Sequence, residues 1–216
     1  MLINKYACSD DCLSVFRHPD IVTSVQFHPF HDSIFISGCL DHRIRVWDIL
    51  PEPGSVRHYE QRQDKITSGN AFLNEQLFCY FVLLVAFSPD GKVVAIGLVQ
   101  GQIFFYEYDS STSTLQYLTL IECRNRQGTY HEGRKITSMQ FLKSQSSSKI
   151  SNRVLKSHEE LSLLVTTNDN RIRLFSLADY SLVMKYKCPY YLNNSMLIRA
   201  SLSEDCQYVI SGNMYD

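Results

Sequence analysis

Short apolar runs alternate with polar turns along residues 18–48 of this chain. Three of these runs, Ile21–Phe27, Ile34–Ser37 and Ile44–Trp47, each have the length of a β-strand and are bounded by turn residues. Side chains within a run either alternate in polarity or are apolar throughout, which are the two patterns of half-buried and fully buried strands. The pattern therefore predicts a meander of short antiparallel strands.

The same pattern returns further along the chain. The phrase VTSVQFHP at 22–29 reappears as LLVAFSPDG at 83–91 and ITSMQFLKS at 136–144, and more weakly as IRASLSED at 198–205. A second phrase follows, as FISGCLDHRIRVWDI at 35–49, VAIGLVQGQIFFYEY at 94–108 and LVTTNDNRIRLFSL at 164–177. Candidate outer strands come next, at Ser55–Tyr59, Leu115–Cys123 and Leu182–Lys187. The repeat unit thus has four strands, and no segment shows the periodicity of a capped helix.

These units predict an all-β repeat fold, whose radial form is a β-propeller. We expect one repeat region over 1–216, with units at about 18–59, 60–123, 134–187 and 196–216. This division corresponds to about three complete blades and part of a fourth, an incomplete ring. Residues 64–81 are interpreted as an insertion within the first strand of the second unit, and residues 144–157 as a serine-rich loop.

Composition narrows the expected location and partners. A net charge of −1 lacks the basic excess that general nucleic-acid or membrane binding uses. Seven scattered cysteines, after a start without an apolar signal segment, favour a reducing cytoplasmic compartment. The longest apolar run, Leu77–Phe87, is too short for a transmembrane helix, which needs about 20 residues.

The phrases VTSVQFHP, SGCLDHRIRVWD, VAFSPDG and TTNDNRIRLFSL resemble the WD-repeat family. NDNRIRLFSL and its flanking phrases are similar to the WD-repeat-containing protein 44 group of rabphilin-type Rab effectors. The resemblance implies a propeller scaffold that contacts other proteins, without catalysis or cofactor. Similarity to this group further implies a role in vesicle traffic, with a small GTPase or a trafficking factor as partner. It also implies a location at the periphery of endosomal membranes. No Rab-contact residue is carried over, because the repeat motif does not encode that contact.

The sequence departs from the family pattern at several positions. Trp-Asp occurs once, at Trp47-Asp48, and its equivalents are Tyr106-Glu107 and Phe175-Ser176. The second unit has Gln100-Gly101 where the first has its turn aspartate. Asp169 keeps that turn position in the third unit, where we expect a blade held mainly by packing.

His18, Ser37 and Asp41 could by themselves suggest a hydrolase triad. The WD-repeat resemblance instead implies a structural tetrad with Trp47, in which the indole donates to the hydroxyl and the imidazole donates to the carboxylate. Such a network would be buried and saturated, whereas a nucleophile needs exposure and an oxyanion site. The tetrad is therefore expected to hold the blade together, with no catalytic residue in the chain.

Two further clusters carry weaker signals. Cys8 and Cys12, near His18, have loose metal-ligand spacing without a second pair, so no metal site is expected. The segment Cys123–Lys135 places basic side chains where an acidic or phosphorylated partner could bind, and a solvated loop is the alternative. Its basic residues are Arg124, Arg126, Arg134 and Lys135.

Family propellers bind partners mainly at the end where loops enter the first strand and leave the second. Alignment places Ile21, Leu40, Lys135 and Asn168 near that end. A truncated propeller without independent function is the alternative reading, and its open blade edges would invite self-association. An enzyme or a nucleic-acid-binding propeller is less favoured, since convergent acids or metal ligands are not visible across the units.

Overall fold

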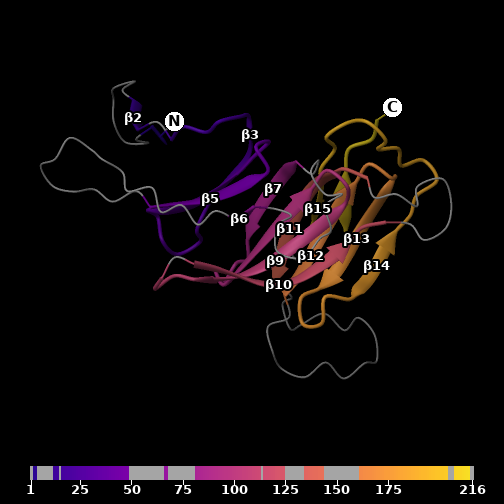
Figure 1. The fold of residues 1–216 in the computed structure, drawn as a ribbon. Helices are drawn as coiled ribbons and strands as arrows, with labels where there is room; N and C mark the ends of the chain where they lie inside the picture. The colour runs from indigo at the N-terminus through magenta and orange to yellow at the C-terminus, as the bar shows by residue number, and fades with distance from the viewer. Residues whose placement is uncertain are drawn as a thin grey trace, which may run out of the picture.

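A computed structural model describes residues 2–3, 12–14, 16–48, 66–67, 81–112, 114–124, 134–143, 161–203 and 207–214. All regular secondary structure in these residues is β (Figure 1). The first unit comprises β3 (Val22–Phe27), β4 (Ile34–Cys39), β5 (Arg43–Asp48) and β6 (Ile66–Thr67). The second comprises β7 (Val82–Phe87), β8 (Val93–Leu98), β9 (Gln102–Asp109) and β10 (Thr114–Glu122). The third comprises β11 (Ile136–Lys143), β12 (Leu161–Thr167), β13 (Arg171–Ser176) and β14 (Leu182–Tyr186).

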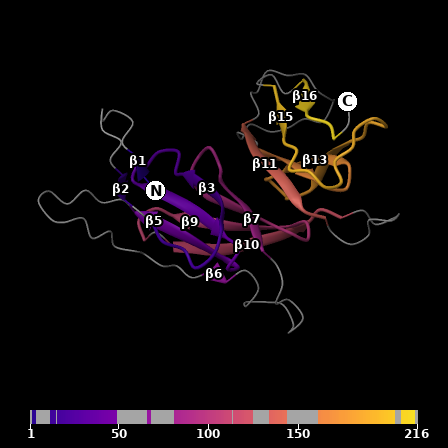
Figure 2. The same cartoon turned by 90° about the horizontal axis from the view of Figure 1, so that it is seen from above.

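Each of these three units is a four-stranded antiparallel sheet with its strands in chain order. A fourth unit contributes a two-stranded sheet of β15 (Ala200–Leu202) and β16 (Val209–Ser211). Near the N-terminus, β1 (Leu2–Ile3) pairs with β2 (Cys12–Ser14). The predicted all-β propeller with three full blades and part of a fourth is confirmed. Figure 2 shows the fourth sheet at the far end of an open arc from the first.

One expected boundary is corrected by the strand pairing. Ile66 and Thr67 form β6, which pairs with Ile44 and Arg43 of the first unit. They therefore complete the first blade and do not open the second unit's first strand. The expected outer strand at Ser55–Tyr59, the remainder of the insertion up to residue 80 and the loop at 144–157 lie outside the described residues.

The inner strands of the three complete units share one irregularity. The register shifts between Val22 and Ser24 in β3, between Val82 and Leu84 in β7, and between Ile136 and Ser138 in β11. A bulge adds one residue to a strand and re-aims the side chain at that point. It lets the Thr23 hydroxyl reach the carbonyl of Val82 in the next unit, 2.9 Å away. In the same way, Thr137 reaches the carbonyl of Ile198, 2.7 Å away.

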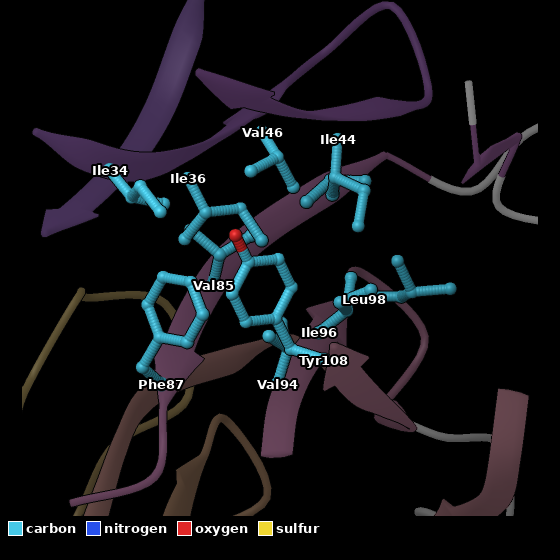
Figure 3. Packing of buried hydrophobic residues seen from close by; sticks show 11 residues of the cluster. Ile34, Ile36, Ile44, Val46, Val85, Phe87, Val94, Ile96, Leu98 and Tyr108 are labelled. Carbon is cyan, nitrogen blue, oxygen red and sulfur yellow. The ribbon is translucent and has the colours of Figure 1, made fainter. Parts of the chain in front are cut away.

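The hydrophobic core lies between neighbouring units. Ile36 and Ile44 of the first unit face Val94, Ile96 and Leu98 of the second, and all five are nearly inaccessible (Figure 3). Further clusters join the second unit to the third and the third to the fourth. Since burying one aliphatic side chain stabilises by about 1.5–3 kcal/mol, packing against the neighbouring blade contributes to the stability of each blade.

Candidate functional site

Three residues of the expected tetrad meet in the first unit. Trp47 Nε1 donates to Ser37 Oγ at 2.8 Å, and His18 Nε2 lies 2.7 Å from the same oxygen. His18 Nδ1 lies 3.2 Å from the carbonyl of Phe16, which can only accept, so Nδ1 carries the proton and Nε2 accepts from the Ser37 hydroxyl. Ser37 is fully buried, which suits a residue that holds the blade together and not an exposed nucleophile.

The fourth residue, Asp41, differs from the expectation. Its carboxylate accepts from Arg45 Nη2 at 2.5 Å and from the backbone amide of Arg43 at 3.2 Å. The imidazole of His18 turns its N–H towards Phe16 instead, so the expected hydrogen bond from His18 to Asp41 is wrong. Burial acts to raise the pKa of Asp41, but the hydrogen bonds from Arg45 and Cys39 outweigh it and lower that pKa.

The third unit repeats this ion pair in a deeper setting. Arg173 Nη2 donates to Asp169 Oδ2, and both side chains are almost completely buried. Thr167 completes the site, since its hydroxyl donates to Asp169 Oδ1 at 2.5 Å and accepts from Arg173 Nη1 at 2.5 Å. Beyond the pair lies Cys123 of the second unit, where burial raises the thiol pKa to about 12. Asp169 therefore holds an arginine across its hairpin, and packing is not the only force in this blade.

Arg45 and Arg173 are the residues that the sequence reasoning missed. A signal was present, because Asp-His-Arg-Ile-Arg at 41–45 and Asp-Asn-Arg-Ile-Arg at 169–173 place an arginine four residues after each turn aspartate. The residue after each aspartate has a positive φ, 66° at His42 and 59° at Asn170. That left-handed turn lets the strand fold back so that aspartate and arginine meet.

The expected partner-contact residues fall at one end of the blades. The Leu40 amide donates to the carbonyl of Ile21 at 2.9 Å, and the Asn168 amide donates to that of Lys135 at 3.0 Å. Ile21 is 66% exposed and Lys135 is also exposed, whereas Leu40 is half-buried and Asn168 is buried. Two of the four are thus available to a partner. The Val99 amide donates to the carbonyl of Phe81, so Phe81 takes the place in the second unit that Ile21 takes in the first. The sequence pattern did not single out Phe81.

The basic segment is only partly described. Arg126 lies outside the described residues, and Arg124 forms an ion pair with Glu122 at 2.6 Å on the surface. Arg134 and Lys135 are exposed at the start of β11. The described residues therefore do not gather these cations into one anion site.

A groove of about 550 Å³ runs along the inner strands β3, β7 and β11, with Arg199 at its margin. No group of three or more His, Cys, Asp or Glu side chains suited to a metal ion occurs within the described part of the chain. Among the same residues, no helix has the length and apolar character needed to cross a bilayer.

Comparisons with known proteins agree with this geometry. The family "WD domain, G-beta repeat" matches residues 10–48. The chain is 37% identical to WD repeat-containing protein 44 of Xenopus laevis over 94% of its own length and 18% of the relative's. It is 33% identical to an uncharacterized WD repeat-containing protein of Schizosaccharomyces pombe over 95% of its length and 29% of the relative's. The chain thus spans less than a third of either relative.

Among solved structures, the crystal structure of RRP9 WD40 repeats aligns with a TM-score of 0.48 and 19% identity. It covers 80% of this chain and 40% of that one. The repeated four-stranded units, the Trp47–Ser37–His18 bonds and the sequence matches lead to one conclusion. The chain belongs to the WD-repeat family of β-propeller proteins.

Proposed function

We propose that this WD-repeat region is a non-catalytic scaffold that binds a protein of membrane traffic, with a small GTPase as the favoured partner class. WD repeats are protein-interaction scaffolds, and the likeness to WD repeat-containing protein 44 supports the narrower assignment. The proposed location is the cytoplasm at the periphery of endosomal membranes. The contact surface is the end of the blades where Ile21 lies.

One observation carries this choice of surface. Large exposed apolar side chains occupy the same place in three units, with 66% exposure at Ile21 and 40% at Phe81, each directly before an inner strand, and 74% at Leu197. Leu197 is equivalent because the next residue, Ile198, accepts from Thr137 as Val82 accepts from Thr23. Apolar side chains repeated at one end of a repeat protein are typical of a contact surface.

Polar groups border this apolar set. Lys135 takes the equivalent position in the third unit and is exposed. His42 stacks on Phe81 with 4.8 Å between ring centroids, so the phenyl ring is held in place. Apolar anchors bordered by charged and polar side chains are the usual composition of a protein interface.

Affinity purification with the 216-residue chain as bait tests this proposal. The triple variant Ile21→Asp, Phe81→Asp, Leu197→Asp should lose the partners that the unchanged chain captures. Leu182→Asp is the matched control, because Leu182 is 50% exposed but lies on the outer strand β14. Retained binding in the triple variant would exclude this surface. Capture that does not include small GTPases or traffic proteins would exclude the narrower assignment.

A further inference from the structure

His28 connects the first two blades at the end opposite Ile21. It follows β3, is only 5% exposed, and packs against two aromatic rings of the second unit. The centroid of its ring lies 5.0 Å from that of Phe87 and 5.6 Å from that of Tyr108. The ring of His31, in the same loop as His28, has its centroid 4.7 Å from that of His28.

The hydrogen bonds of His28 determine its protonation state. Nδ1 lies 3.1 Å from the backbone amide of Phe30 and 3.2 Å from that of His31, and both amides can only donate. Nδ1 must therefore present a lone pair. Nε2 lies 3.2 Å from the carbonyl of Gly91, which can only accept, so Nε2 carries the proton. The site fits the neutral Nε2–H imidazole and no other form.

Gly91 is shaped to receive this ring. A Cβ at Gly91 would lie 2.5 Å from both Cε1 and Nε2 of His28. Gly91 also has a φ of 71°, where a side chain is unfavourable. The imidazole therefore contacts the backbone of the second unit directly, in space that a side chain at residue 91 would occupy.

The equivalent residue in the second unit shows what is special about His28. Ser88 follows β7 as His28 follows β3, and its hydroxyl accepts the Val93 amide at 2.9 Å within its own loop. His28 serves its own loop through Nδ1 and also reaches the next unit through Nε2. Of these two equivalent residues, His28 is the one whose side chain bonds the next blade within the described part of the chain.

We propose that His28 is a pH-sensitive latch between the first and second blades, closed while its imidazole is neutral and released on protonation. A proton on Nδ1 would face the amides of Phe30 and His31, so both accepted bonds would be replaced by contacts between donors. No carboxylate of the described residues pairs with the ring, so the cation would also be buried without a counter-ion from them. Acidification therefore favours separation of the first blade from the second.

Among the described residues, the ionisable groups in contact with the ring are His31 from its own loop and Tyr108 from β9, and Asp90 and Lys92 flank Gly91 in the chain. Asp90 Oδ1 already accepts from Ser88 and from the Lys92 amide. Burial lowers the pKa of His28, the Gly91 bond opposes this shift, and His31 adds to it. The unfolded chain then takes up the proton first as pH falls. The latch is intact above about pH 6.5 and is lost as pH falls from there through the lower folded pKa.

Two measurements on the full chain test the latch. NMR of the imidazole nitrogens at neutral pH should place the His28 proton on Nε2. Amide exchange, corrected for its intrinsic pH dependence, should show protection of β3 and β4 falling by up to about tenfold per pH unit between pH 6.5 and the folded pKa. The strands β12 and β13 of the third unit are the internal reference.

His28→Gln is the central variant, because its amide can still reach Gly91 but cannot titrate in this range. It should remove the extra acid-induced exchange in β3 and β4 that is due to His28. Burial also lowers the pKa of His18, so an acid response from that residue should remain. His31→Gln is the matched control from the same loop and should behave as the unchanged chain. A proton on Nδ1 of His28, or an equal acid response in His28→Gln, would overturn the latch. The NMR measurement decides the question even if His28→Gln does not fold.

Discussion

The first and third blades contain the same Asp-x-Arg-Ile-Arg hairpin in two different surroundings. In the third blade the side chains of Asp169 and Arg173 are 1% and 3% exposed, whereas those of Asp41 and Arg45 are 13% and 7% exposed. The third hairpin faces the second unit, which buries the ion pair beneath Cys123. The first hairpin turns Asp41, Arg45 and Trp47 away from the second unit, and on that side the Trp47 ring packs against Phe16. Equal local sequence therefore leads to unequal burial, because burial depends on the neighbouring blade.

The two hairpins also differ in one supporting side chain. Thr167 gives the third pair a hydroxyl that both donates and accepts, while Cys39 stands at the same place in the first. As a result, Arg45 Nη1 is buried and has no hydrogen-bond acceptor among the described residues. The first blade compensates with the Trp47–Ser37–His18 bonds, which the third blade lacks because Phe175 cannot donate.

Removing the deeper carboxylate should have the largest effect. Asp169→Ala leaves the Arg173 guanidinium buried without its counter-ion, which costs about 3–5 kcal/mol. Urea unfolding of the purified chain measures this loss as a lower midpoint. If Asp169→Ala lost less unfolding free energy than Asp41→Ala, burial would not determine the strength of the ion pair.

The matched change in the first blade should cost less. Asp41→Ala also removes the partner of an arginine, but Asp41 is more exposed than Asp169, so water can take the place of the lost carboxylate. We expect a loss of about 1–3 kcal/mol in the free energy of unfolding. Thermal unfolding of Asp41→Ala and Asp169→Ala side by side compares the two blades. An unchanged stability in Asp41→Ala would show that the first ion pair is not stabilising.

The smallest expected effect is a gain. Cys39→Thr gives Arg45 Nη1 the hydroxyl that Thr167 gives Arg173, and a typical added hydrogen bond contributes about 0.5–1.5 kcal/mol. Thr167→Cys is the reciprocal variant and should destabilise the third blade. Both are measured by urea unfolding under reducing conditions. A loss on Cys39→Thr would mean that the first hairpin cannot adopt the arrangement of the third.

Much of the fold could be predicted from local patterns. Outer strands expected at Leu115–Cys123 and Leu182–Lys187 correspond to β10 and β14, because each is a short β-forming run between turns. For the first blade the pattern predicted an outer strand at Ser55–Tyr59, which lies outside the described residues, and it did not predict β6 as a partner of β5. Ile66 and Thr67 resemble the start of an inner strand, and only their pairing with β5 assigns them to that blade.

The candidate sites also contain some features that the sequence indicated and others that only the structure showed. The Trp47–Ser37 bond follows from a repeat motif, and the spacing of four residues between Asp41 and Arg45 was visible in the sequence. That His18 bonds Phe16 and Ser37 and not Asp41 was decided by the tertiary structure. Phe81 was equally inaccessible to pattern reasoning, because an apolar residue at the end of an apolar run reads as core. The structure shows that the strand begins at Val82, so Phe81 lies outside the strand and its side chain is exposed.

The sequence by itself determined the repeated strands, the turn chemistry and the family, since these depend on side-chain periodicity and on residues near each other in the chain. Tertiary structure decided which face of each blade is covered, how deeply the ion pairs of Asp41 and Asp169 are buried, and that His28 reaches Gly91. The physical reason is that burial and hydrogen bonding between blades join residues about 60 positions apart. A local pattern carries no information about contacts at that separation.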